Sequence, residues 1–149
     1  MSWNISGMKS LEADDWRYLK KFDVIGSSVT WCEEKDRSWM KYKLEEYRID
    51  FKDAVREPKN GRAMGGMILA IRKYIEVIEE ESRQTGGEIV MKDIRIGREE
   101  WKIIYTYMNE DRERNWGMME EEGQDPRDRN SMILGDMEAR IGVEGGDEE

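Results

Sequence analysis

The chain has 149 residues, of which 40% are charged and 38% hydrophobic, and its formal net charge at pH 7 is −9. This length predicts one domain, and the 6 Trp and 11 Met favour a folded chain over a disordered one. The negative charge argues against non-specific binding to nucleic acid or to an anionic membrane, because such binding depends on lysine and arginine. The sequence has no histidine, which excludes His-based zinc sites, Ser-His-Asp triads and histidine acid-base catalysis.

The single cysteine, Cys32, excludes an internal disulfide, and we expect it to be a structural, unreactive thiol. The N-terminus has no basic region followed by an apolar core, so no signal peptide is predicted. No apolar run is long enough to span a bilayer. These observations predict an intracellular protein with no membrane partner.

The first half of the chain alternates between strand and helix patterns. Strands are expected at 2–7 and 22–31, the second of them rich in β-branched residues. Helices are expected at 10–22, with Ser10 as the cap, and at 33–47. A further strand is expected at 48–57, and the Gly-rich segment 58–66 predicts a turn.

The second half is richer in strand patterns. A buried strand is expected at 67–74, followed by an acidic connection at 76–88. Two apolar runs, 89–96 and 100–108, flank a short loop that begins with Gly97 and predict a hairpin. We expect a helix at 109–123 and a last strand at 131–136, and this order predicts an α/β fold with a sheet of about six strands.

Five segments resemble a known family in order and spacing. They are WNISG at 3–7, FDVIGSSVTW at 22–31, GRAMGGMILAIRK at 61–73, WKIIYTYMNED at 101–111 and MILGDMEARIG at 132–142. They resemble the endonuclease/exonuclease/phosphatase family, and most of all the endonuclease domain of insect non-LTR retrotransposons. The resemblance implies the N-terminal part of a four-layer α/β/β/α sandwich over 1–142, an incomplete domain by its length, and a disordered acidic tail over 143–149.

The resemblance also implies a chemistry. Members of the family cut phosphodiesters with a magnesium ion held by carboxylate and amide oxygens, which stabilises charge in the transition state. Asn4 matches the asparagine that organises metal and phosphate, and Tyr107 matches the tyrosine that contacts the phosphate. Asp136 matches the aspartate that orients or deprotonates the attacking water. The implied site residues are therefore Asp136 and Tyr107 for catalysis and Asn4 and Asp136 for Mg²⁺.

Two positions depart from the family pattern. The glutamate that is the main metal ligand falls on Val29, and valine cannot coordinate a hard cation. The asparagine of the GD.N motif falls on Glu138, whose negative charge should repel a phosphate. The resemblance places the catalytic histidine beyond Glu149.

These departures predict a catalytically inactive fragment of a retrotransposon endonuclease, a pseudoenzyme with weak or absent DNA binding. Two alternatives stay open: a non-catalytic protein-interaction module that reuses the fold, and a residual Mg²⁺-dependent nuclease. Half a sandwich would leave the inner face of its sheet uncovered, and we expect self-association through that face or marginal stability.

The residues singled out also have structural interpretations. Asn4 suits a turn or cap, Asp136 a turn that ends a strand, and Tyr107 a half-buried strand position. GRAMGG at 61–66 lacks the ending of a phosphate-binding loop and is better explained as a tight turn. A basic stretch could approach a DNA backbone, although a solvated turn explains it as well: Arg56, Lys59, Arg62, Arg72 and Lys73.

Overall fold

A computed structural model describes residues 1–56, 61, 63–78, 89–107 and 130–136. Its helices are η1 (Met8–Ser10), α1 (Ala13–Leu19), η2 (Glu34–Asp36) and α2 (Arg37–Lys43). Its strands are β1 (Ser2–Asn4), β2 (Val24–Ser28), β3 (Tyr47–Lys52), β4 (Val55–Arg56), β5 (Ala63–Met64), β6 (Met67–Arg72), β7 (Glu76–Val77), β8 (Ile89–Ile96), β9 (Glu99–Tyr107) and β10 (Asn130–Asp136). Over these ranges, no helix has the length and apolar character to cross a membrane.

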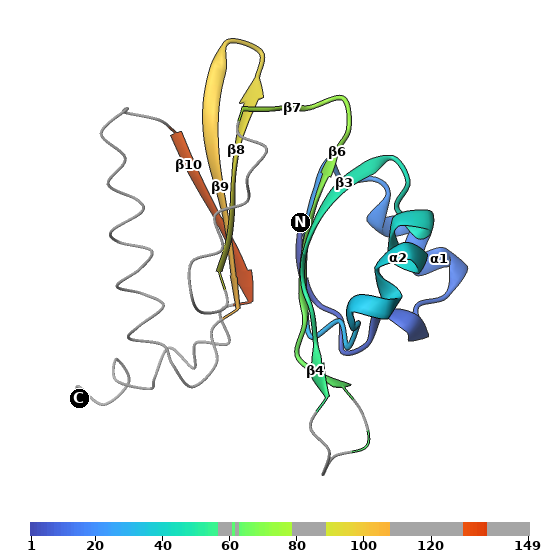
Figure 1. The fold of residues 1–149 in the computed structure, drawn as a ribbon. Helices are drawn as coiled ribbons and strands as arrows, with labels where there is room; N and C mark the ends of the chain where they lie inside the picture. Colours follow the sequence, from blue (N-terminus) through green and yellow to red (C-terminus); the bar gives the residue numbers. More distant parts are fainter. Residues whose placement is uncertain (57–60, 62, 79–88, 108–129, 137–149) are drawn as a thin grey trace, which may run out of the picture.

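The strands form two four-stranded sheets, as the sandwich implied by the family resemblance requires, rather than the single sheet that the strand and helix pattern predicted. The first sheet has the order β1-β2-β6-β3 and the second has the order β10-β9-β8-β7, while β4 and β5 form a separate two-stranded ribbon. The sheets stand face to face, and α1 and α2 cover the outer face of the first sheet (Figure 1). This α/β/β layering is the reason that apolar residues occur on both faces of β6.

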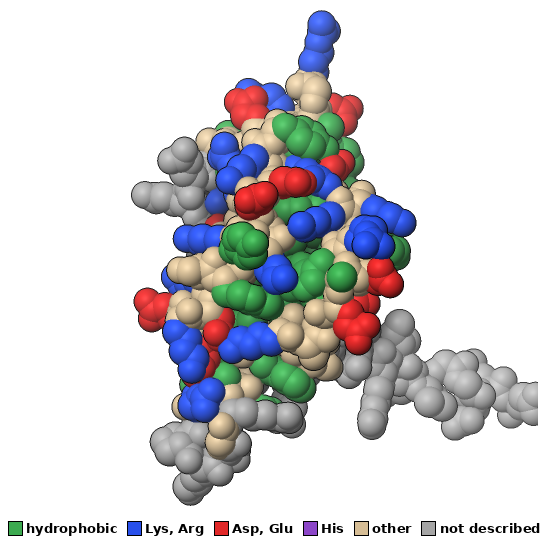
Figure 2. Space-filling view, turned by 90° about the vertical axis from the view of Figure 1, so that its right-hand side faces the viewer, with side chains coloured by type: hydrophobic (Ala, Val, Ile, Leu, Met, Phe, Trp, Pro, Cys, Tyr) green, Lys and Arg blue, Asp and Glu red, His purple; other side chains and the backbone are tan. Residues whose placement is uncertain are grey.

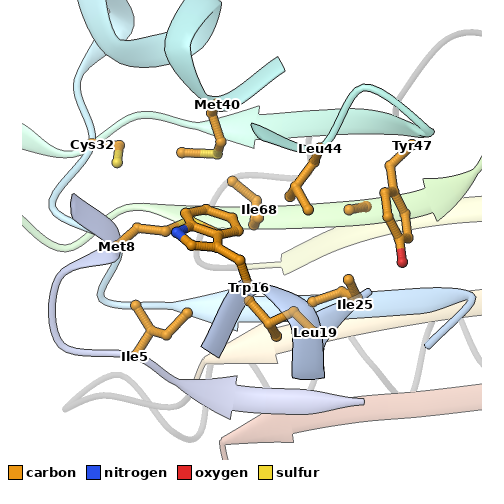
Figure 3. Close-up of a cluster of buried hydrophobic side chains, with 11 residues drawn as sticks. Ile5, Met8, Trp16, Leu19, Ile25, Cys32, Met40, Leu44, Tyr47 and Ile68 are labelled. Atoms are coloured by element: carbon orange, nitrogen blue, oxygen red, sulfur yellow. The ribbon is translucent and has the colours of Figure 1, made fainter. Parts of the chain in front are cut away.

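The first core lies between the helices and the first sheet. Trp16 of α1 packs edge-on against Trp39 of α2, with ring centroids 5.8 Å apart. Figure 3 shows Trp16 amid side chains from both helices and the strands below them. The buried members of this cluster are Ile5, Met8, Trp16, Leu19, Ile25, Cys32, Met40, Leu44, Tyr47, Ile68 and Ala70.

The second core lies between the two sheets and corrects a prediction. The inner face of the first sheet, expected to be uncovered, is covered by strands of the same chain. Met67, Leu69 and Ile71 of β6 pack in one cluster with Val90, Ile94, Ile103 and Tyr105 of β8 and β9. Self-association through an uncovered inner face is therefore not needed to bury these side chains.

The two sheets are in contact where β2 faces β9. A Cβ atom added to Gly26 would lie 2.3 Å from a ring carbon of Tyr105, so only glycine leaves room for this ring. An ion pair also links the sheets, because Lys92 Nζ of β8 lies 3.2 Å from Asp50 Oδ2 of β3. These contacts fix the position of one sheet on the other.

Helix α1 starts later than its sequence pattern predicted. The expected cap, Ser10, instead ends η1, and its hydroxyl donates to the carbonyl of Gly7 at 2.8 Å. The N-cap is Glu12, which forms a reciprocal capping box with Asp15. The acidic residues of the first turn therefore form the cap two residues further along the chain.

The hairpin prediction is confirmed. Strands β8 and β9 pair antiparallel from Ile89 opposite Thr106 to Ile96 opposite Glu99. Only Gly97 and Arg98 connect the paired strands, and Gly97 has φ +61°, as the first position of a tight hairpin turn favours. The predicted helix at 109–123, the tail at 143–149 and most of the connection at 76–88 lie outside the described residues.

Candidate functional site at the strand ends

The predicted site residues stand at the carboxyl ends of four strands. Asn4 ends β1 and is the register partner of Ser28, which ends the parallel strand β2. Asp136 ends β10 and is the register partner of Tyr107, which ends the parallel strand β9. Strand β10 lies against β1 and β2, and in Figure 1 the arrowheads of β9 and β10 point to the end where β4 follows β3.

The loops after β1 and β2 run side by side at this end. The backbone N–H of Gly7 donates to the carbonyl of Val29 at 2.8 Å, and that of Met8 donates to Thr30 at 2.9 Å. The N–H of Trp31 donates to the carbonyl of Gly65 in the turn before β6, also at 2.9 Å. The backbone around Val29 is therefore held by hydrogen bonds to two other segments.

Ion pairs tie the same loops together. Lys9 Nζ lies 2.8 Å from Asp36 Oδ1, which joins η1 to η2. Burial opposes ionisation of Asp36, but hydrogen bonds from Lys9 and from the N–H of Glu33 outweigh it and lower the pKa of Asp36. The hydrogen bond to Asp36 in turn raises the pKa of Lys9. Ion pairs and backbone hydrogen bonds thus join the loops at this end of the first sheet, and we call these loops the rim.

Arg37 and Arg56 extend this rim. Arg37 binds both carboxylate oxygens of Asp53, with Nε–Oδ1 2.9 Å and Nη2–Oδ2 2.5 Å. Arg56 Nε donates to Glu33 Oε1 at 3.1 Å, and this hydrogen bond lowers the pKa of Glu33. The guanidinium groups are therefore committed to neighbouring carboxylates.

Val29 has an unusual backbone for its residue type. Its φ is +55°, in the left-handed region that β-branched residues rarely adopt. It lies between two buried residues, Ser28 and Thr30, at the position where the sequence pattern expects a metal-binding glutamate. The position keeps a conformation that valine itself does not favour.

Ser28 is a further candidate site residue, and the sequence did not indicate it. It is fully buried, and its hydroxyl has no hydrogen-bond partner among the described residues. Alternation along β2 places Ser28 on the face that carries Gly26, which is the face toward the second sheet. A serine inside an apolar strand gave no signal in the sequence, because its burial depends on the second sheet.

The residues fit a magnesium ion poorly. Mg²⁺ prefers near-octahedral oxygen ligands and usually one or two carboxylates. Asn4 and Asp136 are suitable residue types at the carboxyl ends of their strands, but the Val29 side chain supplies no oxygen. Within the part of the chain that the structure describes, no group of three His, Cys, Asp or Glu residues comes together. Glu138, the other altered position, lies outside the described residues.

The structure favours the structural interpretations, rather than the functional ones, of the GRAMGG motif and the basic stretch. GRAMGG contains β5, leads into β6 and opens no helix, and Gly61, Gly65 and Gly66 all have positive φ, as tight turns favour. In the basic stretch, Arg56 binds Glu33, and Arg72 contacts Asp23 and Glu46, while Lys59 and Arg62 lie outside the described residues.

Comparison with solved structures shows the fold. The chain is similar to TDP2 of D. rerio complexed with a single-strand DNA product, with TM-score 0.62, 15% identity and coverage of 91% of this chain and 58% of that one. It is also similar to the human nocturnin catalytic domain with bound sulfate anion, with TM-score 0.58, 10% identity and coverage of 90% and 61%. An endonuclease/exonuclease/phosphatase family protein from Leptotrichia buccalis gives TM-score 0.56, 15% identity and coverage of 90% and 64%.

The chain has the endonuclease/exonuclease/phosphatase fold. This confirms the fold class that the five sequence motifs predicted, and the chain spans about three fifths of the length of these three structures. No protein-family model and no curated protein matches the sequence. Within the endonuclease/exonuclease/phosphatase fold, the roles of Asn4, Tyr107 and Asp136 and the retrotransposon origin stay predictions.

Proposed function

We propose that this chain is a non-hydrolytic version of the endonuclease/exonuclease/phosphatase fold, derived from a retrotransposon-type endonuclease domain. The observation that carries the proposal is Val29. At the end of β2, beside the register pair of Asn4 and Ser28, the chain presents an apolar side chain where magnesium-dependent hydrolysis calls for a carboxylate. The remaining candidates, Tyr107 and Asp136, supply at most part of such a site.

The distribution of surface charge is a second argument, and it favours low affinity for DNA. The face that carries α1 and α2 shows acidic and basic side chains mixed together rather than a basic field (Figure 2). The rim arginines Arg37 and Arg56 are engaged by carboxylates, and the net charge is −9. A DNA backbone is bound through counterion release by free cations, so we expect little affinity at physiological salt.

The test is supercoiled-plasmid nicking by the purified chain in magnesium and in EDTA. We expect no nicking above the background of an Asp136→Ala preparation purified in parallel. Near-UV circular dichroism of the packed Trp16 and Trp39 rings would show that the assayed protein is folded. Nicking that requires both magnesium and Asp136 would overturn the proposal in favour of a residual nuclease.

A second experiment asks whether Val29 is the decisive defect. The paired change Val29→Glu with Glu138→Asn restores both family residues. If Val29 is the decisive defect, the variant binds Mg²⁺ more tightly than wild type, as measured by calorimetry, and Val29→Gln is the neutral control. Equal Mg²⁺ binding by all three proteins would mean that the described strand ends lack more than one ligand.

A further inference from the structure

Helix α2 is basic although the chain as a whole is acidic. Its seven residues, Arg37–Lys43, include three cations and no carboxylate, whereas the net charge of the chain is −9. Arg37 binds Asp53, but Lys41 and Lys43 form no ion pair with any residue that the structure describes. The charges of these two lysines are therefore available to a ligand from outside the chain.

Aromatic rings hold the two lysines on either side of α2. Lys41 Nζ lies 5.9 Å from the ring centroid of Phe51 in β3, and Lys43 Nζ lies 5.9 Å from the ring centroid of Trp16 in α1. Because the two rings belong to different neighbours of α2, the ammonium groups flank the helix. A side chain that is already positioned in this way loses less conformational freedom when it binds a partner.

Tyr42 lies between the two lysines, and its side chain is 74% exposed. Successive residues of a helix are about 100° apart around its axis, so Tyr42 projects to solvent with one lysine on each side. In Figure 2, which views this face, hydrophobic and basic side chains alternate over the middle of the molecule. Cations in the last turn also stabilise a helix, which explains the lysines but not the exposed ring between them. Exposed tyrosines are frequent contributors to protein–protein binding.

We propose that Lys41, Tyr42 and Lys43, here called the α2 triplet, are a docking site for an acidic segment of a partner protein. Carboxylates of that segment pair with the two ammonium groups, and an apolar residue between them covers the ring of Tyr42. The inference goes beyond the loss of hydrolysis and does not depend on it, because α2 lies on the outer face of the first sheet and uses none of the strand-end residues.

The charges around the α2 triplet favour a peptide over a nucleic acid. Two free lysines are too few for the counterion release that holds a DNA backbone. Two exposed carboxylates, Glu45 and Glu46, follow directly after the helix and oppose a continuous row of phosphates. A peptide can place neutral residues opposite these glutamates, since its charges are separate side chains.

Fluorescence anisotropy of a labelled peptide tests the charge. The probe is a short peptide of alternating glutamate and leucine, and the same peptide with glutamine in place of glutamate is its uncharged control. The full chain should bind the glutamate peptide, more weakly as salt rises. Lys41→Ala with Lys43→Ala should weaken binding by about tenfold, as the loss of two exposed charge pairs predicts. Lys73→Ala with Arg98→Ala removes two exposed cations elsewhere and should leave binding unchanged.

A matched pair of tyrosine variants tests the ring. Tyr42 and Tyr74 are 74% and 72% exposed, and each follows a lysine in the sequence. Tyr42→Ala should weaken binding of the glutamate peptide by about fivefold, whereas Tyr74→Ala should not change it. Four results would overturn the proposal: no binding by wild type, equal binding of the glutamine peptide, tighter binding of a labelled DNA oligonucleotide, or equal loss in both tyrosine variants.

Discussion

At the scale of single residues, Val29 combines a side chain that cannot bind a metal ion with a backbone conformation that valine rarely adopts. A β-branched residue at φ +55° costs on the order of 1–3 kcal/mol unless the surroundings impose the conformation. Here they do, because its carbonyl accepts the N–H of Gly7 and its neighbour Thr30 is bonded to Gly66. The hydrogen bonds of the surrounding loops therefore hold Val29 in its strained backbone conformation.

This strain predicts that replacing Val29 stabilises the protein. Val29→Gly and Val29→Asn should each raise the free energy of unfolding by about 0.5–1 kcal/mol, since both residues tolerate left-handed backbone. Urea denaturation measures the change. Val24, a half-buried valine at the other end of β2 without positive φ, gives the control, because Val24→Asn should destabilise. Destabilisation by both Val29 variants would show that its packing outweighs its strain.

Cys32 gives a second residue-scale prediction. Burial raises the pKa of its thiol to about 11, so almost no thiolate exists at pH 8 in the folded protein. Cys32 should react with a maleimide much more slowly than in the protein unfolded by guanidinium. In the unfolded chain the thiol has its ordinary pKa of 9.0, so the free energy of unfolding falls as pH rises from there toward 11. Rapid labelling of native protein would contradict the burial of Cys32.

At the scale of elements, the Lys9–Asp36 pair joins the short helices that follow β1 and β2. The exposed fraction of the Asp36 side chain is 12%, whereas Lys9 is more than half exposed. The pair is thus only partly shielded from water, which limits its contribution to about 1 kcal/mol. Its value lies in linking two loops that flank Val29.

The Asp36 carboxylate should stabilise the fold only when ionised. Because its folded pKa is lowered, this stabilisation is present above the unfolded value of 3.8 and is lost as pH falls through the folded pKa. Asp36→Asn should cost about 1 kcal/mol at pH 7, and the difference from wild type should shrink below pH 3.8, as followed by thermal unfolding. Asp14→Asn, which breaks an exposed pair with Arg17, should cost almost nothing at either pH. A pH-independent loss in Asp36→Asn would contradict the assignment.

Individual elements were predictable where the signal was local. The β-branched run of β2, the apolar run of β6 and the Gly97 hairpin all follow from residues close in sequence. The α1 cap was misplaced by two residues because Ser10 and Glu12 both suit a helix start, and the Asp15 partner decided between them. Short-range chemistry therefore located the elements but not every boundary.

The candidate site was predictable only in part. Asn4, Tyr107 and Asp136 followed from motif resemblance, and the strand register brings their backbone positions to one end of the fold. Ser28 could not be found, because its burial requires a second sheet that begins at Glu76. The strand and helix pattern alone predicted one sheet, and the two-sheet sandwich followed only from the motif resemblance, since strand pairing depends on contacts between residues that are distant in sequence.

At the scale of the whole molecule, the ring of Tyr105 of β9 packs directly against Gly26 of β2 where the two sheets meet. Gly26→Ala should destabilise the protein by about 1–3 kcal/mol, because the new Cβ would overlap the ring and the sheets would have to separate. Chemical denaturation measures this, and Tyr105→Leu in the same background should recover part of the loss. A second substitution that adds its full cost instead would place the strain elsewhere.

The division of the sheets along the chain has a consequence for biosynthesis. The described strands of the first sheet lie between Ser2 and Arg72, and those of the second lie between Glu76 and Asp136. The four described strands of the first sheet, with α1, α2 and the outer core, therefore leave the ribosome before the strands that cover them. During that interval Met67, Leu69 and Ile71 face water, and a nascent chain is most open to chaperones and to aggregation until β9 has emerged and closed over them.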